Sequence, residues 1–117
     1  MDVLVTNNPM VKTRYSNVLQ VDFLDSDLLG VLTYVRDLIH KGHQLLTHPL
    51  SGSIKPNESP YKSVLISGEP MTTDLQSVTI IEECIQATQK FTPRQIPEQN
   101  LNDLQLVDLS LIRTALG

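Results

Sequence analysis

The sequence is poor in the residues that mark several large classes of protein. It has one cysteine, Cys84, no tryptophan and only 4% aromatic residues. A single cysteine excludes an internal disulfide and any Cys-x-x-Cys metal or redox pair. No apolar run approaches the roughly 20 residues that a membrane-spanning helix needs, so we expect no membrane partner. The net charge of −4 argues against a nucleic-acid partner bound through an overall basic surface.

What is present is the composition of an ordinary globular domain. The chain has 117 residues, of which 40% are hydrophobic and 19% charged, so we expect one domain, 1–117, around a single core. Its first residues, MDVLVTNNP, lack the basic segment followed by a long apolar core that marks an export signal. We therefore expect a cytoplasmic protein.

Hydrophobic spacing divides the chain into alternating strands and helices. We expect strands at 3–5, 18–24, 45–48, 63–67 and 104–108. The first is followed by a short helix that Asn8 caps and Pro9 opens. The clearest helix begins after Ser26 and ends at Gly42, a residue that tolerates the left-handed conformation of a helix stop. A capping box at Thr73 predicts a further helix that extends to about residue 91.

The leucine-rich tail, LNDLQLVDLSLIRTALG, allows two interpretations. Its leucines can alternate as a strand or contribute to a two-sided helix. We favour a strand at 104–108 followed by a terminal helix from Ser110, because this completes another strand-helix unit. The tail is also more apolar than one face of a small monomer needs, which raises the prospect of a homodimer.

This order of elements predicts an α/β fold. Strand-helix alternation is typical of a three-layer sandwich in which helices cover both faces of a mostly parallel sheet, here of four to five strands in a small Rossmann-like arrangement. In such sheets ligands bind beyond the carboxyl ends of adjacent strands whose crossovers go to opposite faces. The segments expected there are 6–9, TNNP, and 47–63, THPLSGSIKPNESPYKS.

The segment 47–63 has groups suited to a small anion such as a phosphate or a carboxylate. Consecutive backbone N–H groups at 51–53 and the start of the first helix provide donors, and lysines provide positive charge. Residues 40–63 hold three lysines and all three histidines against Glu58 alone. The residues assigned to this ligand site are Asn7, Asn8, His48, Ser51, Gly52, Ser53, Lys55, Asn57, Tyr61 and Lys62.

A purely structural interpretation of the same segment remains open. Its prolines stiffen the chain, and its serines and asparagine can satisfy their own backbone. The nucleotide-binding patterns GxxxxGK[ST] and GxGxxG are absent, so we expect no cofactor.

Catalysis has weaker support. An enzyme would use His48 with Ser51 or Ser53, but no acidic partner has an interpretable spacing, and LSGSI is not the G-x-S-x-G turn of serine hydrolases. We therefore assign no catalytic residue and favour a protein that is not an enzyme. Cys84 is expected to be a small buried side chain. Three histidines without acidic or cysteine residues at ligand spacing predict no metal site.

Two stretches carry a family resemblance: LVTNNPMV at 4–11 and IHKGHQLLTHPLSGSIKPNESPYKSVLIS at 39–67. Both resemble the GrdX family, small proteins associated with the glycine, sarcosine and betaine reductase systems of amino-acid-fermenting anaerobes. The resemblance implies an accessory role beside these reductases and supplies no catalytic residues. Three hypotheses follow: a small-ligand-binding accessory protein, an interaction partner of a reductase component, and an enzyme based on His48.

Overall fold

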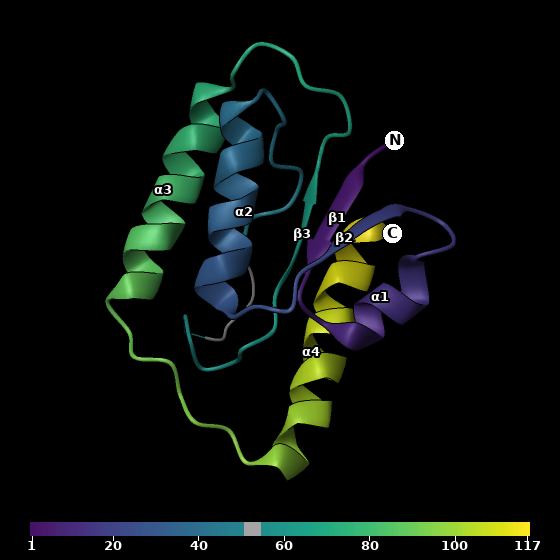
Figure 1. Ribbon diagram of the computed structural model, residues 1–117, viewed down its shortest axis with the longest axis vertical. Coiled ribbons are helices and arrows are strands. Elements are labelled where there is room, and N and C mark those ends of the chain that lie inside the picture. Colours follow the sequence, from purple (N-terminus) through teal and green to yellow (C-terminus); the bar gives the residue numbers. More distant parts are fainter. Residues whose placement is uncertain (51–54) are drawn as a thin grey trace.

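The computed structural model describes residues 1–50 and 55–117. Within these residues the chain forms three strands and four helices (Figure 1). In chain order they are β1 (Val3–Thr6), α1 (Pro9–Tyr15), β2 (Gln20–Phe23), α2 (Leu28–His40), β3 (Ser63–Ile66), α3 (Leu75–Gln89) and α4 (Glu98–Leu116).

The sheet is small and mixed, so the prediction of a mostly parallel, Rossmann-like sheet of four to five strands was wrong. The strand order is β2-β1-β3. β1 runs parallel to β2 but antiparallel to β3, with Thr6 of β1 opposite Ser63 of β3. The carboxyl end of β1 therefore meets the amino end of β3, not the carboxyl end of another parallel strand.

The expected third strand, 45–48, explains this difference. Its apolar residues do not pair with β1; Leu45 instead forms an isolated antiparallel bridge with Ile66 of β3. The backbone N–H of Leu46 also donates to the carbonyl of Leu65 at 2.9 Å. Pro49 follows, and proline cannot donate to a strand ladder. The segment therefore stays at the margin of β3, which takes the place beside β1.

The strand predicted at 104–108 was also wrong, because these residues lie inside α4. Buried and half-buried side chains recur there at the three- and four-residue spacing of a helix, with Asp108 and Ile112 fully buried. Leu106, which a strand would place on the same face as Asp108, is exposed.

Local signals at the helix ends were more reliable. Asn8 caps α1, with its side-chain oxygen accepting the N–H of Met10 at 3.0 Å, and Pro9 opens the helix as predicted. α2 is capped by Asp27, one residue after the predicted Ser26, and α3 by Asp74, one residue after Thr73. Gly42 has a φ of 110°, and a Cβ there would lie 2.0 Å from the carbonyl oxygen of Met71. Only glycine suits this stop.

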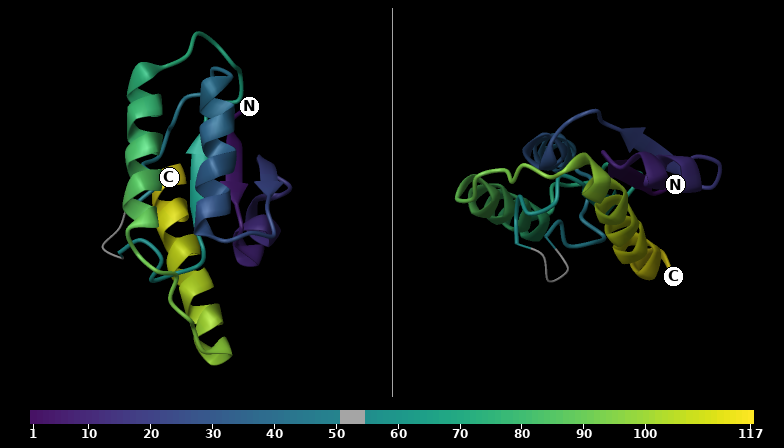
Figure 2. Two further views of the ribbon diagram at one scale, coloured as in Figure 1. Left: turned by 60° about the vertical axis from the view of Figure 1, so that its left-hand side comes forward. Right: turned by 90° about the horizontal axis from the view of Figure 1, so that it is seen from below.

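Helices cover both faces of the sheet, as the two views of Figure 2 show. Side chains alternate along β1, so Val3 and Val5 pack in one core with α2 and α3, whereas Leu4 packs in a second core with α1 and α4. Valines and isoleucines dominate the first core, and Val11, Leu65 and Ile112 complete the second.

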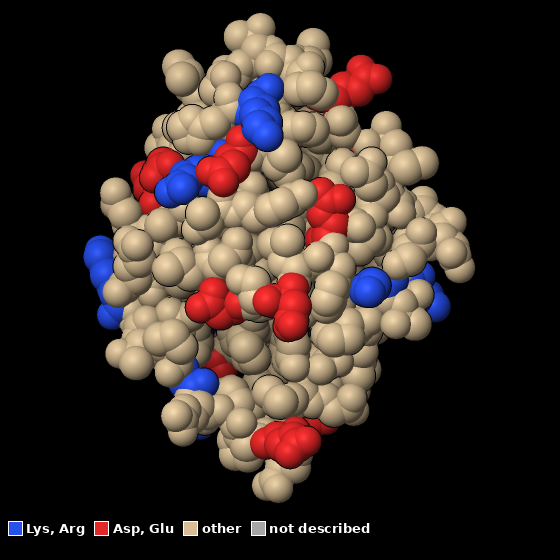
Figure 3. All heavy atoms as spheres, viewed as in Figure 1, with Lys and Arg blue, Asp and Glu red and all other residues tan. Residues whose placement is uncertain are grey.

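The surface is mostly uncharged on the face drawn in Figure 3, where acidic and basic side chains are interspersed. Across the two described stretches of the chain, no helix combines the length and the apolar character needed to cross a membrane.

Candidate functional site

The end of β1 and the segment that precedes β3 are joined by Asn7. Its side-chain oxygen accepts the backbone N–H of Lys62 at 2.9 Å. Its side-chain nitrogen donates to the carbonyls of Ser26 and Pro60, at 2.8 and 2.7 Å. The predicted meeting of TNNP with the 47–63 segment is therefore present, although it forms across an antiparallel strand pair.

A buried polar cluster attaches α4 to the same place. The Asp108 carboxylate accepts the backbone N–H of Ser63 at 3.1 Å, the Ser63 hydroxyl at 2.8 Å and the Asn8 side-chain amide at 3.0 Å. The hydroxyls of Thr6 and Ser63 lie 2.7 Å apart. Because each strand end supplies a donor to one carboxylate, this cluster fixes α4 against the sheet.

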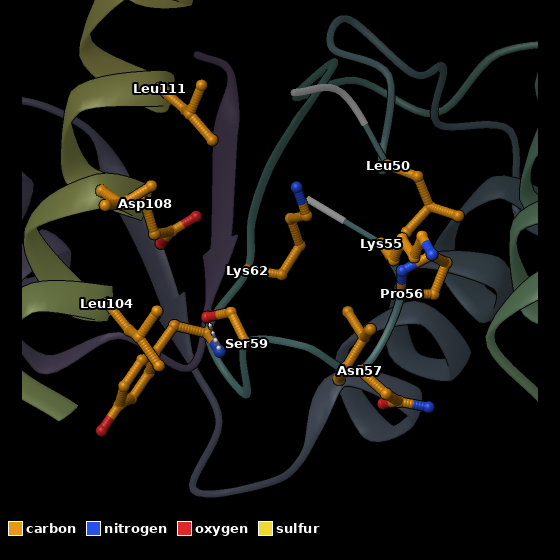
Figure 4. Close-up of a pocket in the computed structure, with 12 residues that line it drawn as sticks. Leu50, Lys55, Pro56, Asn57, Ser59, Lys62, Leu104, Asp108 and Leu111 are labelled. Atoms are coloured by element: carbon orange, nitrogen blue, oxygen red, sulfur yellow. Dashed lines mark hydrogen bonds between the residues drawn. The ribbon is translucent and has the colours of Figure 1, made fainter. Parts of the chain in front are cut away.

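A pocket lies between α4 and the segment before β3 (Figure 4). Its cavity has a volume of about 30 Å³, and the wider space at its mouth is open to solvent. The described residues that line it are Leu28, Leu50, Lys55, Pro56, Asn57, Ser59, Tyr61, Lys62, Leu104, Val107, Asp108 and Leu111. Half of these twelve residues are apolar, and the charged ones among them are Lys55, Lys62 and Asp108.

Lys62 is the half-buried charged group of this pocket. Its side chain extends into the space between Asp108 of α4 and the side chains of Leu50 and Pro56 (Figure 4). Burial lowers the pKa of the Lys62 ammonium, because the charged form loses hydration, and the nearby Asp108 partly opposes this effect.

The predicted site residues separate into three groups. Lys55, Asn57, Tyr61 and Lys62 are brought together in the pocket wall. Asn7 and Asn8 lie behind it, buried and hydrogen-bonded to protein atoms. Ser51, Gly52 and Ser53 fall outside the described residues.

His48 is not among the described residues that line the pocket. Its side chain is exposed, and its Nδ1 accepts the backbone N–H of Leu50 at 3.1 Å. This contact gives His48 a local role in shaping the turn before the pocket.

Asn57 shapes the opposite end of the segment. It has a φ of 68°, a left-handed conformation that asparagine tolerates better than most residues. Its side-chain nitrogen donates to the carbonyls of Thr88, in the last turn of α3, and Phe91, just after α3, at 2.9 and 2.7 Å. Asn57 therefore ties the pocket wall to the end of α3.

The α4 wall of the pocket was missed by the sequence analysis. Leu104, Asp108 and Leu111 share one side of α4, but the strand assigned to 104–108 concealed this relationship. A usable signal was Asp108 itself, a charged residue inside the apolar run LQLVDLSL. A buried carboxylate needs hydrogen-bond partners, so it marks a place where α4 meets polar groups.

The structure also bears on two further kinds of chemistry, a nucleophilic cysteine and a metal site. Burial, the charge of Glu83 and a smaller opposing effect of Lys62 leave the pKa of the Cys84 thiol at about 11. Cys84 is therefore mainly a thiol at neutral pH and a poor nucleophile. In the described part of the chain, no three histidine, cysteine, aspartate or glutamate side chains group closely enough to hold a metal ion.

Comparison with known proteins identifies a family. The model of the GrdX-like protein family matches residues 3–117, nearly the whole chain. Searches of curated proteins and of solved structures find no match.

Proposed function

The chain belongs to the GrdX-like protein family, and from this premise we propose that it binds a small anion in the pocket between α4 and the segment before β3. As part of this proposal, the protein acts in the cytoplasm as an accessory to an amino-acid reductase; the resemblance to a family associated with such systems supports this role. In this proposal the anion site contains residues of α4 as well as residues of the 47–63 segment.

One observation carries this proposal: Lys62 directs a half-buried ammonium into a pocket that is half apolar. A charge partly removed from water interacts more strongly with an opposite charge than an exposed one does. Asp108 lies near Lys62, and its carboxylate accepts three hydrogen bonds from Asn8 and Ser63. A ligand carboxylate or phosphate would complement Lys62 directly, with Lys55 near the rim.

Binding without chemistry is the better supported function. General acid-base catalysis needs a titratable group that can exchange a proton with a ligand. The Asp108 carboxylate already accepts three hydrogen bonds from protein groups, and the Cys84 thiol is held protonated by burial. The third hypothesis, an enzyme that uses His48 with Ser51 or Ser53, draws no support from the described pocket wall.

Thermal unfolding in the presence of anions tests the proposal. We expect acetate, butyrate or phosphate to raise the Tm at constant ionic strength, because a ligand bound only by the folded state stabilises it. Lys62→Met should abolish the shift and Lys55→Met should reduce it. Lys41→Met, at the exposed far end of α2, is the matched control and should retain the shift. Equal shifts in all three variants, or none in the wild type, would refute the proposal.

A second candidate function rests on the outer side of α4. Leu106 is 48% exposed and lies outside the pocket lining, whereas Val107 and Leu111, which are 41% and 37% exposed, also line the pocket. Such apolar side chains on one helix suit contact with another protein, either a reductase component or a second copy of the chain.

Purified components test this second candidate. We expect the chain to co-elute with a reductase subunit, and Leu106→Asp to prevent this while Val18→Asp, an exposed apolar position far along the chain, does not. Light scattering of the chain alone reports any homodimer. A monomer that binds none of the purified reductase subunits would eliminate this function.

A further inference from the structure

The walls of the pocket are informative about the body of the anion as well as its charge. We propose that the ligand is a monocarboxylate with a short apolar body and no amino group next to the carboxylate. This inference rests on the proposed function and narrows it to one chemical class. The carboxylate lies at Lys62, and the apolar body lies among the leucines of α4 and the Leu50 side of the pocket.

The lining favours an apolar body. Leu104 and Leu111 of α4 face Leu50 and Pro56 across the space into which Lys62 points (Figure 4). Leu28 and Val107 complete this apolar wall. A ligand that contacts Lys62 can therefore place its remaining atoms against aliphatic side chains. Hydrocarbon removed from water there contributes favourably, whereas polar atoms would lose hydration without replacement.

A carboxylate makes fewer demands on the polar lining groups than a phosphate does. The Tyr61 hydroxyl accepts a hydrogen bond from Gln105 at 2.9 Å, and the Ser59 hydroxyl accepts the N–H of Tyr61 at 3.2 Å; in these bonds each hydroxyl is an acceptor and keeps its single O–H as a donor. The Asn57 amide nitrogen donates to two backbone carbonyls. A phosphate presents three oxygens and nearly two charges, so it needs several donors. A carboxylate has two oxygens and one charge, and an ammonium with three N–H donors can serve it alongside its other contacts.

The carboxylate of Asp108 disfavours two kinds of ligand: those with two negative charges and those with an amino group next to the carboxylate. It lines the same pocket as Lys62, so a doubly charged ligand meets more repulsion than a singly charged one. Its two oxygens already accept three hydrogen bonds, two of them at Oδ2. A ligand ammonium would thus find little acceptor capacity there and would lie close to the positive charge of Lys62. An α-amino acid should therefore bind less tightly than the acid without the amino group.

A chain-length series tests this inference. Dissociation constants measured by calorimetry for acetate, propionate, butyrate, pentanoate and hexanoate should fall about fourfold for each added methylene until the pocket is filled. Butyrate should bind more tightly than phosphate, than 2-aminobutyrate and than butylamine. The acid series varies the length of the apolar body with the carboxylate unchanged. The comparison of butyrate with 2-aminobutyrate and butylamine varies the polar groups on a four-carbon body.

Two leucines of α4 provide a matched pair of variants. Leu111 lines the pocket, whereas Leu106 is an exposed leucine of the same helix outside the lining. We expect Leu111→Ala to weaken hexanoate binding severalfold with acetate unchanged, and Leu106→Ala to leave both unchanged. Because Leu111 is partly exposed, its replacement should not prevent folding.

The outcomes separate this inference from the proposed function. Binding of anions with no dependence on chain length, or tighter binding of phosphate than of butyrate, would overturn the inference and leave the anion site standing. Tight binding of butylamine in place of butyrate would overturn both. No binding of any anion would also overturn both.

Discussion

Asp108 of α4 and Ser63 of β3 form a two-point hydrogen-bonded pair, in which one carboxylate accepts both the backbone N–H and the hydroxyl of the serine. The two residues are 45 positions apart in the chain, and both are buried. This pair holds the last helix at the place where β1 ends and β3 begins. The pocket depends on it, because α4 forms one wall of the pocket.

Loss of this carboxylate should destabilise the protein. In Asp108→Asn the new amide group faces donors from Ser63 and Asn8, so at least one buried donor loses its acceptor. We expect the free energy of unfolding to fall by about 3 kcal/mol, as measured by urea denaturation. Asp103→Asn, exposed on the same helix, should change it by less than about 0.5 kcal/mol. Similar losses in the two variants would contradict this role of Asp108.

The two sides of α4 should respond differently to truncation. Ile112 is buried in the second core and Leu106 is exposed. We expect Ile112→Ala to reduce the free energy of unfolding by about 2–4 kcal/mol through the cavity it leaves, and Leu106→Ala by less than about 0.5 kcal/mol. Chemical denaturation of both variants checks this. If Leu106→Ala proved as costly as Ile112→Ala, the strand interpretation of 104–108 would regain support.

The sequence was informative where local chemistry decides the structure. The cap at Asn8, the proline that opens α1 and the left-handed Gly42 each follow from the conformational preferences of one residue. These features required no knowledge of the rest of the chain.

The sequence-based prediction failed where a segment suited two structures about equally well and contacts with residues far away in the chain decided between them. Leu45 and Leu46 have a strand-like composition, but which strand they pair with depends on how the chain returns to β1. The run from Leu104 to Asp108 suits both a strand and a helix. Ser63 and Asn8, far away in sequence, favour the helix by supplying partners to Asp108. The α4 side of the pocket was missed for the same reason.

High pH should reveal the contact between Tyr34 and Asp22. The Tyr34 hydroxyl donates to Asp22 at 2.7 Å, and this hydrogen bond, with burial and the carboxylate charge, raises the pKa of Tyr34 to about 12. Since the folded-state pKa lies above the unfolded value of 10.0, the associated stabilisation is complete below about pH 10 and is lost as the pH rises through about 12.

Phenolate absorbance provides the measurement. One phenol should titrate at about pH 12, and Tyr34→Phe should remove that transition. Asp22→Asn should move it toward the ordinary value, whereas Asp25→Asn should not. A titration in which Asp22→Asn leaves the transition at about 12 would show that the carboxylate is not its main cause.

The reactivity of Cys84, a residue of α3, should depend on the charge of Lys62 in the pocket. Its pKa is raised to about 11, chiefly by burial, while Lys62 acts in the opposite direction. Compared with an ordinary thiol, the thiolate fraction at pH 8 is lower by about two orders of magnitude. We therefore expect iodoacetamide to modify the folded protein at least about a hundred times more slowly than the protein in urea.

The same reaction reports on the position of Lys62. Removal of its positive charge in Lys62→Met should raise the pKa of Cys84 further and slow alkylation of the folded protein. Lys55→Met should leave the rate unchanged, because Lys55 is not among the groups that shift the Cys84 pKa. An anion bound at Lys62 should mimic Lys62→Met by neutralising the ammonium. Alkylation that is faster in Lys62→Met than in the wild type, with the two equally stable, would place Lys62 too far from Cys84 for this coupling.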